Sequence, residues 1–593
     1  MTQTPATDQT NTPAHANDHA PCYITTPIYY VNDRPHIGHC YTTLVADVLA
    51  RAQRLLGRDV FFLTGTDEHA EKVVKAAADN GMSPMDWATK NAERFKDAFT
   101  FMGFSNDDFV RTTEDRHKTR ASAYIKKLKD ADIIYKGEYK GWYDPSQEEY
   151  VTETTAKEND FKSPVTGKPL EERTEENYFF RLSNYETWLK ATINSGELKI
   201  LPEARKNEVL GRIAQGLNDV PVSRRIKQGD PDWGVVMPDD PEHRVYVWIE
   251  ALCNYLTTVD TEDRRKYWPQ RSADDAHPAP TITHLMAKDI LWFHAVIWPA
   301  MLHALGETIP STVYAHAYWI AEGRKMSKSL GNFIEIDTLR AYAARYHLDA
   351  VRWFLTTQGP LGPTDADFAH ARFVEVYNAD LANGIGNATS RVSNMIEKYL
   401  GGEIERTCDG RFGFEEGVAL QTARAARAAA GNPVDDDSRV FDLRSSCEEA
   451  LRKAEASLAN DCITDTLTAG KALSDEVDAF IAYAAPFTLA KRLDEFEHGQ
   501  RALATILYAS AEALRIASLL LAPAMPFQMA ELWRRWNCNH LTLPDDPNSP
   551  FVAPLEHLAH WAGDFGLKPG QRIAKGDPLF MRADPAEPAP SAN

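Results

Sequence analysis

Two short strings, far apart in the chain, carry side chains suited to binding phosphate groups. They are His36–His39 (HIGH) and Lys325–Ser329 (KMSKS). At the start of a helix, two imidazoles three positions apart face the same side, where backbone N–H groups and the helix dipole favour an anion such as a triphosphate. Ammonium groups on a Gly- and Ser-rich loop suit a leaving pyrophosphate, because nucleotidyl transfer depends mainly on positioning and charge neutralisation.

Each string also has a simpler interpretation. Two histidines at a helix start can be capping or core residues, and a short Lys/Ser run is more often a solvated basic turn. A motif of this length is therefore a hypothesis until its surroundings agree with it.

The segments around the first string predict the start of a parallel α/β sheet. Tyr23–Pro27 indicates a buried strand, and an amphipathic helix is expected from about Ile37 to Leu56. A second strand, Val60–Leu63, ends in the polar run Thr64–His69. This β-turn-α-β order opens a doubly wound sheet, whose ligands bind beyond the C-terminal ends of the strands. The polar residues after both strands should therefore converge on one crevice.

Other residues at expected strand ends could complete such a site. Asp67 could hold a substrate ammonium group, although Asp is also a common helix N-cap. A further strand of the sheet is expected over Val245–Trp248. The run Trp248–Tyr255 at its end is aromatic and apolar, which suits a pocket wall but is more often core. Asp289 could accept hydrogen bonds from ribose hydroxyls, and His294 follows at helical spacing.

Bulk properties limit the class of protein. A chain of 593 residues is too long for one core, so roughly three or four domains are expected. No apolar run approaches the length of a membrane span, and no secretory or transit signal is evident. The 7 cysteines are scattered without Cys-x-x-Cys spacing, which predicts a reducing cytoplasm without disulfides. With a net charge of −20, any RNA site must be a defined surface.

From about Cys22 to Ala530 the chain resembles the class I aminoacyl-tRNA synthetases, and among them the methionyl-tRNA synthetase family. The agreement runs in the expected order through the segments YITTPIYYVNDRPHIGH, FFLTGTDEH, GWY, EENYFFRLS, VYVWIEAL, AKDILWFHAVIWPAML, GRKMSKSLGN, NGIGNATSR and APAMP. The resemblance implies a two-step reaction. Methionine and ATP, with Mg2+, give methionyl-adenylate and pyrophosphate, and the aminoacyl group then passes to the terminal adenosine of tRNA(Met).

The resemblance also implies roles for individual residues. His36 and His39 would stabilise the phosphates together with Lys328 and, in support, Lys325. The ATP site would add Gly38 and Asp289. The methionine site would comprise Pro27, Ile28, Tyr30, Asp67, Trp248, Ala251, Tyr255, Ile290 and His294. In it, Asp67 would bind the α-ammonium group, Tyr255 and His294 would lie near the thioether, and Trp248 would close over the side chain.

Anticodon recognition would fall on Asn387, Arg391 and Phe487. Asn387 and Arg391 are four positions apart and share a helix face that is rotated away from the apolar stripe of Leu381, Ile385 and Val392. A solvated polar face is the simpler alternative. Phe487 stands where the family has a base-stacking tryptophan, and it offers a smaller ring without an N–H donor.

Two further departures from the family concern the inserted knuckle and the adenine site. Asp144 and Gln147 stand where many relatives have a first cysteine pair, and Ser163–Gly167 contains no cysteine, so no structural zinc is expected. Ala287 replaces the usual glycine before Asp289, and its Cβ would crowd the adenine slightly. The family's optional C-terminal domain is not evident, so a monomer without membrane contact is expected.

The expected organisation is a split Rossmann-type catalytic domain with an inserted knuckle subdomain, followed by an all-α helical-bundle anticodon-binding domain. Its parts are a disordered leader (1–20), the first half of the catalytic domain (21–136), the knuckle (137–200), the second half (201–322), the KMSKS loop and stem-contact region (323–367), the helical domain (368–582, with a loop or insertion at about 406–439) and a disordered tail (583–593).

Three alternatives stay open on the sequence alone. They are a class I synthetase for another amino acid, a small-molecule nucleotidyltransferase, and a catalytically silent tRNA-binding paralogue. The Lys325–Ser329 loop and the helical last third disfavour the nucleotidyltransferase. The presence of His36, His39, Asp67 and Lys328 disfavours the silent paralogue.

Overall fold

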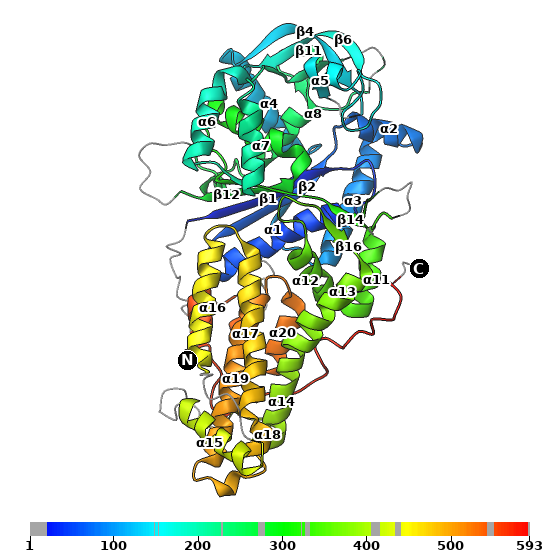
Figure 1. Cartoon of the computed structure of the whole chain (residues 1–593). Coiled ribbons are helices and arrows are strands. Elements are labelled where there is room, and N and C mark those ends of the chain that lie inside the picture. The colour runs from blue at the N-terminus through cyan, green and yellow to red at the C-terminus, as the bar shows by residue number, and fades with distance from the viewer. Residues whose placement is uncertain are drawn as a thin grey trace, which may run out of the picture.

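A twisted parallel sheet lies at the centre of the N-terminal two thirds of the chain, and a bundle of helices extends from one side of it (Figure 1). In this computed structural model the described residues are 20–146, 149–151, 153–226, 229, 231–270, 279–321, 323–326, 332–404, 416–432, 441–542 and 551–590. The predicted fold class is confirmed. The predicted domain limits stay a prediction, and the expected leader lies outside the described residues except for Ala20.

The central sheet has six strands in the order β3-β2-β1-β12-β13-β7, and all its pairings are parallel. The strands are β1 (Cys22–Tyr30), β2 (Val60–Asp67), β3 (Asp108–Arg111), β7 (Lys199–Leu201), β12 (Thr281–Ala287) and β13 (Thr312–His316). Helix α1 (Ile37–Leu55) follows β1 and is buried along most of its length. Because every strand runs the same way, the residues after β1, β2 and β12 meet at one edge, as the sequence predicts.

One expected strand is wrong. Val245–Trp248 does not return to the central sheet. Instead β11 (Asp240–Val245) lies in a small antiparallel sheet with β9 (Ser223–Arg225) and β10 (Val236–Met237), and the chain turns at Tyr246 into α8 (Val247–Leu252). A short apolar run has no periodicity that separates a buried strand from a buried helix, and α8 is buried on nearly all sides.

The inserted knuckle is a four-stranded sheet in the order β5-β4-β6-β8, dominated by the antiparallel pair β4 (Ile134–Asp144) and β6 (Glu171–Phe180). The outer strands are β5 (Glu149–Val151) and β8 (Val220–Pro221). Its tip is held by polar side chains. The backbone N–H and hydroxyl of Ser146 both donate to Asp144, and the Ser146 and Thr166 hydroxyls lie 2.8 Å apart. The Ser163 hydroxyl accepts from two backbone N–H groups of the next turn. These hydrogen bonds lie at the positions where the resemblance described above would place cysteines. Gln147 is outside the described residues.

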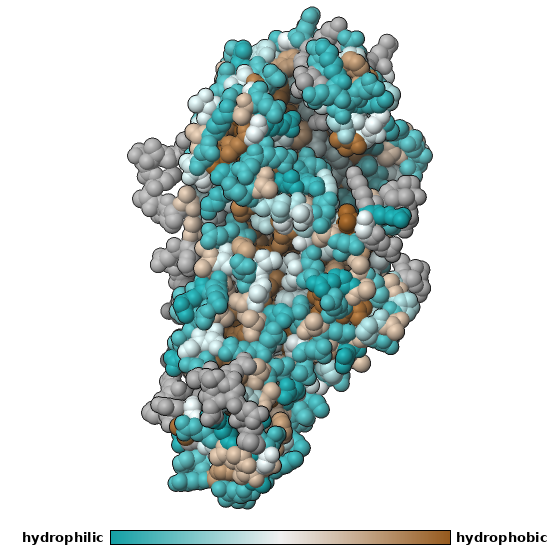
Figure 2. Space-filling view, viewed as in Figure 1, coloured by the Kyte–Doolittle hydropathy of each residue, from teal (hydrophilic) through white to brown (hydrophobic). Residues whose placement is uncertain are grey.

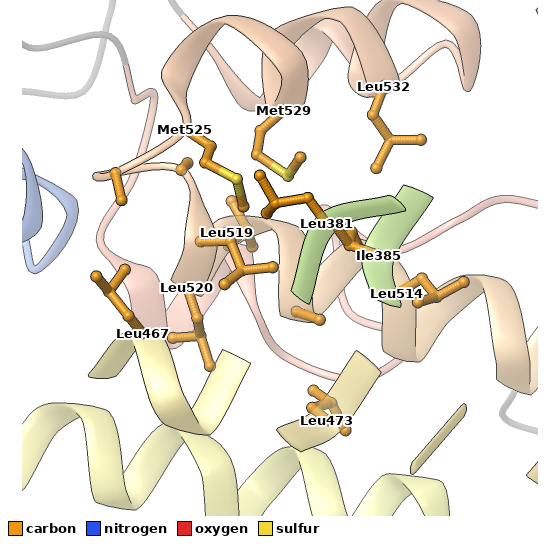
Figure 3. Close-up of a cluster of buried hydrophobic side chains, with 14 of the residues drawn as sticks. Leu381, Ile385, Leu467, Leu473, Leu514, Leu519, Leu520, Met525, Met529 and Leu532 are labelled. Carbon is orange, nitrogen blue, oxygen red and sulfur yellow. The ribbon is translucent and has the colours of Figure 1, made fainter. Parts of the chain in front are cut away.

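The helical domain is organised around α19 (Gly499–Leu521), which packs against its neighbours on all sides (Figure 1). Figure 3 shows leucine, isoleucine and methionine side chains from several helices meeting at this helix. The neighbours are α14 (Gly386–Leu400), α15 (Glu416–Ala429), α16 (Leu443–Leu458), α17 (Ile463–Ala484), α18 (Pro486–Leu489) and α20 (Pro526–Arg535). Of the described helices, only α19 is long and apolar enough to cross a membrane, but 94% of its apolar window is buried inside the protein. A core helix meets the same test. The visible face in Figure 2 is mostly hydrophilic, with hydrophobic residues in small scattered groups.

The segment at about 406–439, expected as a loop or insertion, contains helix α15. Its Ala419, Leu420, Ala423 and Ala426 are buried. Alanine has the highest helix propensity, so an alanine-rich run becomes a packed helix once a neighbouring face covers its small side chains. Residues 405–415 and 433–440 lie outside the described part of the chain.

The chain end also differs from expectation. The sequence places a disordered tail over 583–593, but residues 583–590 lie along the helical region. The Ala583 N–H donates to Asn378, and Arg345 donates to the carbonyl of Pro588. Composition alone predicts disorder here, because it does not reveal that side chains of other helices satisfy this backbone.

A buried ion pair joins the helical domain to the sheet. Arg352 of α12 (Leu348–Gln358) contacts Asp47 of α1 at 2.6 Å, and both side chains are fully buried. The same guanidinium donates to the carbonyls of Met102, Pro523 and Ala524. Burial opposes ionisation of Asp47, but Arg51 and Arg352 lower its pKa to about 2. One arginine thus connects α1 to the turn between α19 and α20.

Candidate active site

A cavity of about 540 Å³ lies at the C-terminal edge of the sheet, beyond β1, β2 and β12. Most of the predicted ATP and methionine residues line it, namely Pro27, Ile28, Tyr30, His36, Gly38, His39, Asp67, Trp248, Asp289 and Ile290. Ala251, Tyr255 and His294 are buried. Segments separated by more than two hundred positions therefore meet at one site.

The two histidines cap helix α1. The backbone N–H of Gly38 donates to Nδ1 of His36 at 3.1 Å, and the backbone N–H of His36 donates to Nδ1 of His39 at 3.3 Å. Because each Nδ1 accepts a hydrogen bond, the proton of a neutral ring resides on Nε2. Burial, with a smaller contribution from His36, keeps the pKa of His39 well below its ordinary value of 6.5, so this ring is neutral. A Cβ at position 38 would lie 2.9 Å from the His36 ring, so glycine is needed there.

The capping role of His36 and His39 therefore does not exclude a role of the same residues in binding an anionic ligand. His36, Gly38 and His39 line the cavity at the helix N-terminus, where the helix dipole favours negative charge. A neutral imidazole with its proton fixed on Nε2 is a hydrogen-bond donor that does not change charge near neutral pH.

The segments that flank the KMSKS string are tied to the same helix end. Lys325 lies in β15 (Arg324–Lys325), which pairs with β14 (Trp319–Ala321). On the other side of the string, the Ile334 carbonyl accepts from the N–H of Ile37, and the Phe333 ring lies 4.9 Å from His36. Lys328 is outside the described residues, as is the side chain of Lys325. Both ends of the loop are nevertheless fixed beside α1.

Asp67 and Trp248 form one wall of the cavity. Asp67 ends β2, pairs in register with Tyr30 and is only 2% exposed. The Trp248 ring meets Tyr30 edge-on at 5.9 Å and stacks on Phe293 at 4.4 Å. A buried carboxylate beside an aromatic wall suits a ligand that is cationic at one end and apolar at the other.

Tyr255 and His294 make a neutral, hydrogen-bonded pair. The Nδ1 atom of His294 lies 2.9 Å from the Ile290 carbonyl, which can only accept, so Nδ1 carries the proton. Nε2 then accepts from the Tyr255 hydroxyl at 2.7 Å. Burial lowers the pKa of His294 to about 4, although the Ile290 hydrogen bond opposes this shift. Neither residue lines the cavity itself, and the pair forms a buried layer that is polarizable but uncharged near neutral pH.

Asp289 lines the cavity from the turn after β12. Burial raises its pKa above the ordinary value, and a hydrogen bond with Tyr318 partly offsets that effect. Neighbouring Lys288 pairs with Asp365 at 2.7 Å, and Ala287 also lines the cavity. A carboxylate in this position can accept hydrogen bonds from hydroxyl groups of a ligand.

The sequence did not single out several residues that line the cavity. They are Asn32, Arg34, Lys72, His316, Tyr318, Trp319 and Phe333. Arg34 could have been found from the sequence, because it lies in the turn that follows β1. Lys72, whose ammonium lies 5.6 Å from the Tyr30 ring, comes from α2 (Glu71–Asp79), and only the three-dimensional fold brings it here.

Glu250 is a second feature that the sequence did not predict. Its buried carboxylate lies 2.7 Å from Nε2 of His117 and 3.2 Å from Nδ1 of His69. Burial opposes its ionisation, but the two histidines lower its pKa. Glu250 lies between Trp248 and Ala251, and His69 follows Asp67 closely, so this cluster joins α8 to the end of β2.

The three predicted RNA-reading residues lie in the helical domain, away from the cavity. Asn387 and Arg391 on α14 both bond to Asp478 of α17, at 3.3 and 2.8 Å. Phe487 is the second residue of α18 and is 45% exposed. An exposed aromatic ring is compatible with stacking on a base.

Comparison with known proteins first gives a class. The parallel sheet, the histidine-capped helix and the cavity belong to a region matched by the family "tRNA synthetases class I (M)", over residues 22–159 and 154–393.

Whole-chain relatives narrow this class. Methionine–tRNA ligase of Thermotoga maritima is 36% identical over 95% of this chain and 80% of its own length, and that of Mesorhizobium japonicum is 36% identical over 94% and 97%. The structure of Mycobacterium tuberculosis methionyl-tRNA synthetase in complex with methionyl-adenylate matches with a TM-score of 0.76 and 31% identity, covering 95% of this chain and 100% of that one. The chain belongs to the methionine–tRNA ligase family.

Proposed function

We propose that this chain joins methionine to tRNA(Met) at the expense of ATP, through methionyl-adenylate. One observation carries the proposal. A helix N-terminus with two histidines and a wall with a buried carboxylate, Asp67, line the same cavity. The carboxylate of a methionine held at Asp67 could therefore attack the α-phosphate of an ATP held at α1.

For the first step, the N-terminus of α1 would bind the phosphates, with Nε2–H of His36 and His39 as donors. Asp289 would accept from the ribose, and Lys325 and Lys328 would neutralise the leaving pyrophosphate. Among the described residues, no group of three or more His, Cys, Asp or Glu side chains is placed to hold a metal ion. Mg2+ would arrive on the phosphates of ATP, where it usually keeps several waters.

For methionine, Asp67 would bind the α-ammonium group through a charge-assisted hydrogen bond. The side chain would extend along Trp248 toward Tyr255 and His294. This wall is aromatic and neutral near physiological pH, and a thioether makes favourable contacts with aromatic rings. A charged side chain would lose its hydration there without gaining a partner of opposite charge.

For tRNA, Asn387 and Arg391 would contact anticodon bases, and Phe487 would stack on one of them. Asp478 holds the first two side chains on one face of α14. The enzyme would act as a monomer in the cytoplasm, which agrees with the free cysteines among the described residues.

The decisive experiment is methionine-dependent exchange of labelled pyrophosphate into ATP, with leucine and cysteine as controls. We expect exchange with methionine alone. No exchange with any amino acid would rule out the enzyme, and exchange with leucine or cysteine instead would rule out the specificity.

Two variants test the methionine-binding and the phosphate-binding parts of the proposed site separately. Asp67→Asn keeps the shape but removes the charge, so the KM for methionine should rise about 10- to 100-fold, since hydrogen bonds to charged groups contribute ~1.5–3 kcal/mol. Lys328→Ala should slow adenylate formation by orders of magnitude and leave methionine affinity nearly unchanged. Equal losses of methionine affinity in both variants would contradict these roles.

A further inference from the structure

Helix α15 supports the corner that presents Phe487. Its buried face, formed by Ala419, Leu420, Ala423 and Ala426, packs against α18 and α19. Figure 1 shows α15 and α18 at the end of the bundle farthest from the sheet. No other part of the proposed function uses α15.

Arg427, in the last turn of α15, binds the end of α17. Its Nη1 atom donates to the carbonyl of Tyr483 at 2.7 Å and to that of Ala482 at 3.2 Å, while its Nε donates to the Asn432 carbonyl. The last carbonyls of a helix have no partner within the helix, and a cation there also interacts favourably with the helix dipole. The guanidinium therefore acts as a C-cap from another helix.

The corner that follows needs support. Ala485 adopts a left-handed conformation with φ of 44°, which an L-residue with a Cβ adopts only at a cost in free energy. Pro486 then starts α18, and Phe487 is the next residue. The direction in which the Phe487 ring points therefore depends on the strained residue Ala485. Arg427 binds the carbonyls of Ala482 and Tyr483, which lie shortly before Ala485.

We propose that α15 is a support helix for anticodon recognition and that Arg427 is a positioning residue that orients Phe487 for stacking on an RNA base. This inference rests on the proposed role of Phe487. It assigns a function to a segment whose sequence predicts only a loop or insertion. Arg427 acts through the corner at Ala485 and not by contact with RNA.

The test compares Arg427→Ala, Phe487→Ala and the double variant in full-length protein. We expect each single variant to raise the KM for tRNA(Met) in aminoacylation by about 5- to 20-fold, in the range of lost base stacking. The double variant should be no worse than Phe487→Ala alone, because Arg427 acts only through that ring. Multiplication of the two single effects would overturn the proposal, and so would an unchanged KM in Arg427→Ala.

Two further measurements separate positioning from other roles. Pyrophosphate exchange, which needs no tRNA, should keep its wild-type rate in all three variants, which also verifies that they fold. The dependence of tRNA binding on salt should keep its wild-type slope in Arg427→Ala, whereas loss of a phosphate contact would reduce the slope by about 0.7–0.9. A reduced slope would overturn the positioning role.

The controls keep failure of this inference distinct from failure of the proposed function. Lys453→Ala removes one exposed positive charge from neighbouring α16 and should leave the KM for tRNA unchanged. Arg427→Lys keeps the charge but loses the forked donor, so its KM should fall between those of wild type and Arg427→Ala. An unchanged KM in Phe487→Ala would overturn the assigned role of Phe487 and this inference with it, while normal pyrophosphate exchange would leave the ligase activity standing.

Discussion

Replacement of Tyr255 by phenylalanine tests whether the hydrogen bond between its hydroxyl and His294 contributes to the methionine site. The hydroxyl donates to Nε2 of His294 at 2.7 Å, and Nδ1 of His294 is already used as a donor to the Ile290 carbonyl. The variant keeps the ring and its packing but leaves Nε2 as a buried acceptor without its donor.

The magnitude follows from that unsatisfied atom. A buried acceptor that loses its donor costs ~1–3 kcal/mol, so the free energy of unfolding should fall by about this amount. In the variant, a water that enters the site would donate to Nε2 in place of the hydroxyl, and methionine would displace this water on binding. Methionine binding would then lose one hydrogen bond of ~1–1.5 kcal/mol, which corresponds to about a 5- to 10-fold rise in the KM for methionine.

Tyr23→Phe is the matched control. The Tyr23 hydroxyl is also buried and donates to the backbone carbonyl of Tyr255 at 2.8 Å, so this control removes a buried hydrogen bond that does not involve His294. We expect a similar loss of stability in urea unfolding and an unchanged KM for methionine in pyrophosphate exchange. If Tyr255→Phe also left the KM unchanged, the proposed hydrogen-bonded wall would have no part in methionine binding.

Three more predictions concern stability and positioning. Burial raises the pKa of Asp349 to about 7, although the Gln528 N–H and Arg352 oppose this. The folded protein then holds a proton that the unfolded chain releases, so the free energy of unfolding should fall by up to about 4 kcal/mol as the pH rises from about 4 to 7. Asp349→Asn should abolish most of that decline in urea titrations, and an unchanged pH profile would refute the assignment. Glu250→Gln keeps the shape but loses charge-assisted hydrogen bonds to His69 and His117. It should lower the free energy of unfolding by ~1–3 kcal/mol, and it should raise the KM for methionine several-fold more than that for ATP, whereas equal changes in both KM values would contradict a positioning role. Zinc chelation in the presence of Mg2+ should change neither the exchange rate nor the melting temperature, and one tightly bound zinc per chain would contradict the metal-free knuckle.

Local periodicity and strand-end rules were sufficient for the first strands of the central sheet and the helix between them. A strand, a turn at 32–35, helix α1 and strand β2 follow from alternation of apolar residues and from the polar runs that end each strand. The prediction of a strand at Val245–Trp248 was wrong because buried strands and short buried helices have the same composition. The prediction of a loop or insertion missed helix α15 for a different reason, since the small apolar face of this helix becomes evident only once α18 and α19 cover it.

The site shows the same division between local and distant information. His36, Asp67 and Asp289 occupy strand ends and could be placed from the sequence. Lys72 and Glu250 could not, because their relevance comes from contacts with segments far along the chain. The tautomers of the histidines were also inaccessible, since each depends on a specific acceptor such as the Ile290 carbonyl.

Helix α1 links the two functions of the chain. The N-terminus of α1 lies at the cavity, and its middle carries Asp47, which forms a buried ion pair with Arg352. The Arg352 guanidinium also donates to the carbonyls of Pro523 and Ala524 in the turn between α19 and α20. Separating the partners of a buried ion pair leaves each charge uncompensated. The packing that keeps Asp47 and Arg352 together is therefore favoured over alternatives that separate them. In the proposed complex, the distance between the cavity and Phe487 would therefore be set by packed helices. A tRNA bound at its anticodon would then meet the cavity at a separation that the Asp47–Arg352 pair helps to maintain.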